Sequence, residues 1–110
     1  MGATCAAVLL AVLSVNAMAA DVAGDAAKGK QKNAMCAGCH GIPGWRTAFP
    51  ELYSVPKLGG QHPQYIVAAL KEYKDGQRSH STMHAIASGL SEQDMADLAA
   101  YYSAAGGDKK

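Results

Sequence analysis

Two cysteines and a histidine form the stretch of this chain whose residue types and spacing most directly suggest a chemistry. In MCAGCHG, Cys36 and Cys39 are separated by two residues, and His40 follows the second cysteine directly. Thiols at this spacing occur in redox dithiols, in zinc sites and at the attachment point of c-type haem. In an exported protein a plain disulfide is a further alternative. The elements around the motif must decide between these uses.

The surroundings of the motif favour haem attachment. A thioredoxin-like dithiol opens a helix that follows a strand, whereas this motif ends a predicted helix that no strand precedes. A zinc site needs two ligands besides the thiols. The histidines that could supply them are His40, His62, His80 and His84. No finger-like hairpin precedes the last two. In haem attachment, two thiols one helical turn apart add to the vinyl groups, and the imidazole that follows is held beneath the iron.

The other face of such an iron needs a ligand from elsewhere in the chain. Met83 lies in SHSTMHAIA, which we expect to be an irregular segment that can carry its sulfur to the iron. Met35 stands beside the motif and Met95 in the apolar stripe of a helix, so neither is expected to bind. His80 and His84 are the alternative ligands, although their hydrophilic surroundings favour the surface. A thioether ligand raises the reduction potential relative to a second histidine, and a filled coordination sphere disfavours enzymatic chemistry.

Residues 1–19 have the pattern of a signal peptide. The first twenty residues contain no charged side chain, and they include the apolar run AAVLLAVL and an Ala-x-Ala that ends at Ala19. We expect cleavage after Ala19 or Ala20, which removes Cys5 and leaves residues 20–110 as one mature periplasmic domain. A membrane anchor is the alternative, but the apolar run is much shorter than the roughly 20 residues that span a bilayer.

Length and charge limit what the mature domain can be. A domain of this size buries a thin core, so a covalent cofactor that supplies apolar surface would stabilise it. Ten basic residues balance nine acidic ones, for a net charge of +1. This balance gives no sign of nucleic-acid binding, and we expect no stable membrane insertion of the mature chain.

Three helices are expected to position the motif, and the fold class is therefore all-α. The first begins at Asp25 and ends at the motif. The second begins at Pro63 and ends at Gly76. The third begins after Ser91, whose side chain can form a capping box with the acidic residue three positions later, and ends near Gly106. A short helical turn over 85–88 is also possible, and no segment shows the alternation of a strand.

The apolar residues of these elements fall into two stripes and one loop. The expected stripes are Ile66, Val67, Leu70 and Tyr73 on the second helix, and Met95, Leu98, Ala99 and Tyr102 on the third. The apolar loop residues are Trp45, Phe49, Leu52, Tyr53, Val55 and Leu58. A loop this long in so small a domain is unusual unless it packs against something other than protein, which is consistent with a flat apolar cofactor.

These pieces together resemble the class I c-type cytochromes, and most closely a single domain of the cytochrome c4 and c553 group. The matching pieces are GDAAKGK, CAGCHG, VPKLGGQHPQYIVAALKEYKDGQR, TMHAIA and LSEQDMADLAAYYS. The resemblance implies a small class I cytochrome c fold, with three main helices and loops around one covalently attached haem c. It also implies a periplasmic carrier of single electrons between respiratory or oxidative redox partners, which is not an enzyme.

The same resemblance assigns roles to individual residues. Cys36 and Cys39 match the thioether anchors, and His40 and Met83 match the proximal and distal ligands of the iron. Pro56 matches the proline whose carbonyl accepts a hydrogen bond from the proximal histidine.

Further residues match contacts around that site. Gly29 matches the glycine at which the terminal helices cross, beneath Tyr101 or Tyr102, and Arg46 or Tyr65 could bind a haem propionate. The alternative functions are a haem subunit of a larger oxidoreductase complex, and a small haem peroxidase or gas-binding protein with a labile methionine ligand.

Overall fold

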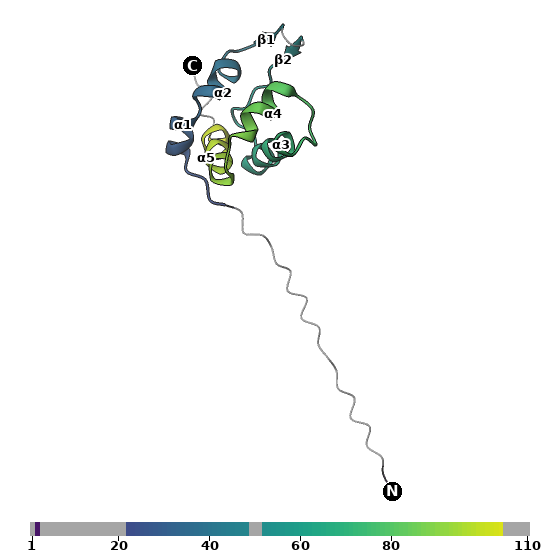
Figure 1. Cartoon of the computed structure of the whole chain (residues 1–110). Coiled ribbons are helices and arrows are strands. Elements are labelled where there is room, and N and C mark those ends of the chain that lie inside the picture. The colour runs from purple at the N-terminus through teal and green to yellow at the C-terminus, as the bar shows by residue number, and fades with distance from the viewer. Residues whose placement is uncertain (1, 3–21, 49–51, 105–110) are drawn as a thin grey trace.

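A computed structural model of the chain describes residues 2, 22–48 and 52–104. Of the predicted signal peptide, only Gly2 is among them, and Cys5, Phe49 and Gly106 also lie outside the described residues. Over the described ranges the chain forms five helices and one pair of short antiparallel strands (Figure 1). None of the helices in these ranges has the length and apolar character needed to cross a membrane.

The chain is mostly helical, which confirms the all-α class. The helices are α1 (Ala26–Lys32), α2 (Ala34–His40), α3 (Pro63–Asp75), α4 (Ser81–Ser88) and α5 (Glu92–Ser103). The strands β1 (Arg46–Thr47) and β2 (Tyr53–Ser54) lie in the predicted irregular segment and pair Arg46 with Ser54 and Thr47 with Tyr53. Helix α1 packs on α5, and α3 packs on both α4 and α5.

The first predicted helix is in fact two helices that meet at Asn33. The backbone of Asn33 turns out of helical geometry, with φ −82° and ψ 3°, and its carbonyl accepts hydrogen bonds from the N–H groups of Cys36 and Ala37. Asparagine has a low helix propensity, so it is a suitable place for the break. The break separates α1, which packs on α5, from α2, which carries the cysteines.

Helix α4 replaces the irregular segment that the sequence predicts. It begins well before the possible turn at 85–88, because the His80 side chain caps it: Nδ1 accepts a hydrogen bond from the Met83 N–H at 3.2 Å. Histidine is not among the preferred N-cap residues, so the sequence carries no recognisable start signal here. Met83 therefore lies in the first turn of a helix, and its prediction as a loop residue is wrong.

The predicted starts of α3 and α5 are confirmed. Pro63 is at the first position of α3, and Gly76 ends that helix in the left-handed region at φ 80°. At the start of α5, the Asp94 N–H donates to Ser91 Oγ at 3.0 Å, while Asp94 Oδ2 accepts from the Ser91 N–H at 2.9 Å. The described part of α5 ends at Ser103, short of the predicted Gly106.

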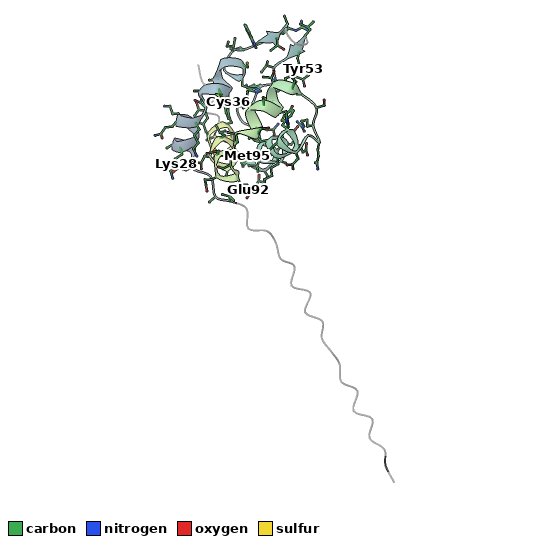
Figure 2. The ribbon with its side chains drawn as sticks, in the orientation of Figure 1. Lys28, Cys36, Tyr53, Glu92 and Met95 are labelled. Carbon is green, nitrogen blue, oxygen red and sulfur yellow. The ribbon has the colours of Figure 1, made fainter. Side chains whose placement is uncertain are left out.

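The hydrophobic core lies mainly where α5 packs on α3. Met95, labelled in Figure 2, is buried as well. The buried apolar residues are Ile66, Ala87, Met95, Ala96, Leu98, Ala99 and Tyr102. All four residues of the stripe predicted for the third helix are among them, whereas Val67 and Leu70 are only partly buried around the cluster. Three of the seven core residues are alanines, so the core offers little apolar area of its own.

Helices α1 and α5 cross in direct backbone contact at Gly29, as predicted. A Cβ atom on Gly29 would overlap the backbone carbonyl of Asp97 and would approach the Cβ of Tyr101 to 2.7 Å. Gly24, which precedes α1, meets the carbonyl of Ala96 in the same way. A side chain at either glycine would push the two helices apart.

A buried carboxylate also joins these two helices, and no pattern in the sequence predicts it. Asp97 is 0% exposed and accepts hydrogen bonds from the Asp25 N–H and from Gln93 Nε2, both at 2.9 Å. Lys32 Nζ donates to its Oδ2 at 2.6 Å. This ammonium group is the main cause that lowers the pKa of Asp97 to about 2.

Candidate functional site

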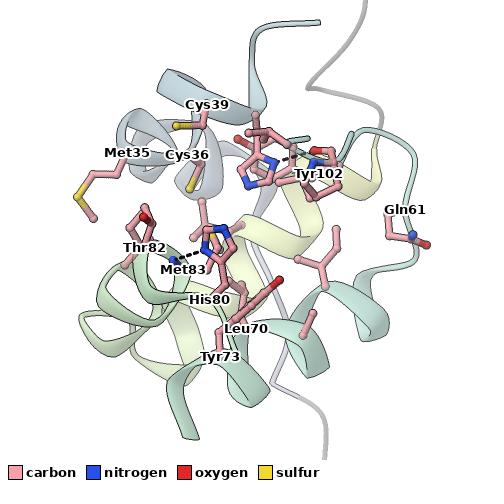
Figure 3. A pocket seen from close by; sticks show the side chains of 18 of the residues that line it. Met35, Cys36, Cys39, Gln61, Leu70, Tyr73, His80, Thr82, Met83 and Tyr102 are labelled. Atoms are coloured by element: carbon pink, nitrogen blue, oxygen red, sulfur yellow. Dashed lines mark hydrogen bonds between the residues drawn. The ribbon is translucent and has the colours of Figure 1, made fainter. Parts of the chain in front are cut away.

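Helix α2 places both thiols and the imidazole of the motif on one cavity. Cys36, Cys39 and His40 line a cavity of about 330 Å³, and Met83 on α4 and Pro56 also line it. Figure 3 shows the two cysteines on one helix and Met83 on another, with His80 at the start of that second helix. The structure thus brings together five residues that the sequence and the family resemblance single out, although 43 positions separate His40 from Met83.

The wall of this cavity is mainly apolar. Among the described lining residues, all the charged side chains are basic. The aliphatic lining residues are Val55, Pro56, Leu58, Ile66, Ala69, Leu70, Ile86, Leu90 and Leu98. Lys57 and Arg78 also line it, whereas no aspartate or glutamate of the described chain does. An apolar ligand that carries negative charge at its edge suits such a wall.

A hydrogen bond to the backbone orients the imidazole of His40. Its Nδ1 lies 2.7 Å from the carbonyl oxygen of Pro56. Because a carbonyl can only accept, Nδ1 must carry the proton, which leaves the lone pair of Nε2 available in the neutral ring. A backbone partner of this kind fixes the ring and raises the basicity of the other nitrogen when it binds a metal.

The two thiols are half-buried and unpaired. Cys36 and Cys39 are free cysteines, so they do not form the plain disulfide considered above. Burial raises the pKa of the Cys36 thiol, and the neighbouring Tyr102 hydroxyl offsets part of this rise. Burial is also the main cause that raises the pKa of Tyr102 to about 12. That hydroxyl lies on the cavity wall beside the Cys36 thiol.

The ligand set of a zinc site is missing from the described part of the chain. Its histidines, cysteines and acidic residues nowhere gather in a group of three or more that could hold a metal ion. His62 and His84 do not line the cavity. His84 instead has its Nδ1 2.7 Å from the carbonyl oxygen of Tyr73.

Only some of the apolar loop residues that were expected to pack against a cofactor line the cavity. Tyr53, Val55 and Leu58 line the cavity. Trp45 and Leu52 do not, and 42% and 70% of their surfaces are exposed. Around β2 the alternation of an extended chain accounts for part of this division, because Tyr53 and Val55 are two positions apart, whereas Leu52 is next to Tyr53.

Arg78 is a cavity residue that the sequence interpretation missed. Of the two proposed propionate partners, Tyr65 lines the cavity and the exposed Arg46 does not. The guanidinium group of Arg78 lies over the rings of Tyr65 and Tyr73, 5.8 and 5.3 Å from their centroids, and donates to Glu72 at 3.2 Å. The sequence position of Arg78, just after Gly76, does not show that it lies at the site. The turn that ends α3 brings its side chain back to the cavity.

These observations fit a covalently attached haem. Two free thiols on one helix face an apolar cavity, and an imidazole beside them is fixed in the tautomer that can bind a metal. The wall has no described acidic residue that would repel propionates, and it includes two cations.

Comparison with known proteins gives the same assignment. The family model for cytochrome c matches residues 26–104. Cytochrome c-554(548) of Halomonas halodenitrificans is 45% identical over 84 residues, which cover 74% of this chain and 96% of that protein. Cytochrome c4 of Pseudomonas aeruginosa is 40% identical over 94 residues, covering 86% of this chain but only 44% of the relative. This chain therefore spans less than half the length of that cytochrome c4.

A solved structure of a relative supports the same fold. Reduced cytochrome c4 from Pseudomonas stutzeri superposes with a TM-score of 0.58 and 37% sequence identity, over 74% of this chain and 45% of that one.

Proposed function

Because the chain belongs to the cytochrome c family, whose members carry electrons on covalently bound haem c, we propose that it is a periplasmic single-electron carrier with one haem. Cys36 and Cys39 would form the thioether bonds, and His40 and Met83 would bind the iron from opposite faces. The observation that carries the proposal is that α2 and α4 bring these four side chains to one apolar cavity.

Different residues of the chain would have different roles in binding the haem. Each thiol would add across a vinyl double bond, sulfur to one carbon and hydrogen to the other, so attachment needs no oxidant. The Pro56 carbonyl would keep the Nε2 of His40 directed at the iron through its bond to Nδ1. The haem would supply the one-electron ferric/ferrous couple, and a thioether ligand would favour the ferrous state.

Partner docking would take place beside the motif, where the haem edge would be nearest to the surface. Electron transfer slows steeply with distance, so a redox partner must approach this edge closely. Met35, Ile42 and Trp45, on either side of the motif in the sequence, leave apolar surface exposed. Solvent-exposed apolar side chains of this kind are suited to a short-lived contact with a larger respiratory or oxidative enzyme.

Absorption spectra and mass together test the proposal. The protein recovered from a periplasmic extract should have the mass of residues 20–110, or of a chain cleaved one residue later, plus one haem that resists acid-organic extraction. The Met83→Ala variant should lose the ferric methionine-to-iron charge-transfer band and have a lower midpoint potential, because a soft ligand is removed. Met95→Leu is the matched control, since Met95 is buried in the core and does not line the cavity. A band that survives in Met83→Ala would remove Met83 from its role.

A further inference from the structure

His80 holds the backbone of the proposed distal ligand in place. Its Nδ1 accepts a hydrogen bond from the Met83 N–H at 3.2 Å, and its carbonyl accepts from the His84 N–H at 2.8 Å. The Met83 N–H belongs to the first turn of α4, where backbone donors have no partner within the helix. The His80 side chain therefore satisfies the donor of the very residue whose sulfur is proposed to bind the iron.

The orientation of the His80 ring argues against its being a ligand itself. A backbone N–H can only donate, so Nδ1 is the acceptor, and the proton of the neutral ring is on Nε2. Neither nitrogen then has a free lone pair. The ring is half-buried on the cavity wall and makes an edge contact with Tyr53, with centroids 4.8 Å apart, and a more distant one with Tyr73 at 6.4 Å. These two rings hold the imidazole in its capping position.

The chain contains a natural comparison for this contact. His62 precedes α3 as His80 precedes α4, and both backbones are extended, with φ −61° at His62 and φ −164° at His80. The side chain of His62 makes no capping hydrogen bond. Helix α3 begins with Pro63 at its first position, where the fixed φ of proline favours a helix start. Helix α4 has no proline, so its start depends on the side chain of His80.

We propose that His80 is the positioning residue for Met83, which keeps the first turn of α4 closed and so keeps the methionine sulfur on the iron. The inference rests on the proposed function, since it takes Met83 as the ligand. Without the cap the first turn of α4 would open more often, and each opening would move Met83 away from the iron and admit an external ligand.

The test compares His80→Ala, His80→Asn and His62→Ala in the haem-loaded protein. Two readouts are measured: the amide hydrogen exchange of Met83 in the ferrous state, and the rate of carbon monoxide binding to ferrous haem. Loss of an N-cap bond corresponds to roughly a fivefold change in the opening equilibrium, so both readouts should rise about fivefold in His80→Ala. Asparagine is a good N-cap, so His80→Asn should return both to within about twofold of the native protein, and His62→Ala should leave them unchanged.

Failure of this inference is distinguishable from failure of the proposed function. If His80→Ala matches His62→Ala in both exchange and carbon monoxide binding, His80 does not position Met83, whatever the ligand. If exchange rises in His80→Ala but carbon monoxide binding does not, the cap holds the helix without holding the ligand, and the inference is also wrong. A charge-transfer band that persists in Met83→Ala would instead overturn the ligand assignment itself.

Discussion

At the scale of single residues, Asp97 shows how one charge can be kept inside a small domain. Burying a carboxylate without partners is costly, but here a backbone N–H, an amide and an ammonium group satisfy it. The same Lys32 Nζ lies 2.8 Å from Asp94, and hydrogen bonds to both carboxylates raise the pKa of Lys32. The carboxylate of Asp97 thus joins α5 to α1 and to the residue that caps α1.

We predict that Asp97 makes the fold sensitive to acid. Its pKa is lowered from the ordinary 3.8 to about 2, chiefly by Lys32, so its contribution to stability is complete above about pH 4 and is lost as the pH falls through 2. Asp97→Asn should lower the urea midpoint at pH 7 and flatten the decline of stability between pH 4 and 2. Asp75→Asn, at the exposed end of α3, is the control. An Asp97→Asn protein with the native pH dependence would contradict this role.

At the scale of elements, the crossing of α1 and α5 depends on the absence of a side chain at Gly29. The carbonyl of Asp97 occupies the place that a Cβ would take, and backbone atoms cannot rotate away as a flexible side chain can. The crossing also positions α2, because only Asn33 separates α1 from the helix that carries the thiols. A displacement of α1 would therefore reach the cavity.

We predict that Gly29→Ala destabilises the protein by about 3 kcal/mol, the upper part of the range for overpacked sites. Gly89→Ala is the matched control. Gly89 has φ −84°, and its nearest neighbour to a new Cβ is an Ile86 oxygen at 3.7 Å, so alanine should be neutral or stabilise by up to about 1 kcal/mol. Urea denaturation of the haem-loaded proteins measures both. Equal midpoints for the two variants would show that the helices separate at little cost.

At the scale of the whole molecule, the fold surrounds the cavity more than it surrounds a core. The described core contains seven buried apolar residues, whereas the cavity is lined by residues from α2, both strands, α3, α4 and α5. Without a ligand the apolar lining of this cavity of about 330 Å³ would stay in contact with water, so its side chains would contribute little hydrophobic stabilisation. Domains are stable by only roughly 5–15 kcal/mol in total, so the loss of this contribution would weigh heavily in so small a domain.

We therefore predict that the chain does not fold cooperatively without its haem. The Cys36→Ser, Cys39→Ser double variant, purified free of haem, should show no sharp thermal transition by circular dichroism at neutral pH, whereas the haem-loaded native protein should. A cooperative transition in the haem-free variant within about 5 °C of the native one would show that the protein atoms suffice, since that interval corresponds to only about 1 kcal/mol in a domain of this size.

Local signals in the sequence determined where a helix begins or ends when a capping residue or a proline stands at that end. The sequence also determined the chemistry of the motif. Pro63, Gly76 and the Ser91–Asp94 box act within a few residues of chain, so α3 and the start of α5 could be predicted. The tertiary structure alone decided the rest. A histidine caps α4 only because Tyr53 and Tyr73 hold its ring there, and Arg78 and Asp97 acquire roles only from partners on other elements. Spacing along the chain shows what a residue type can do, but which groups meet depends on packing between segments distant in sequence.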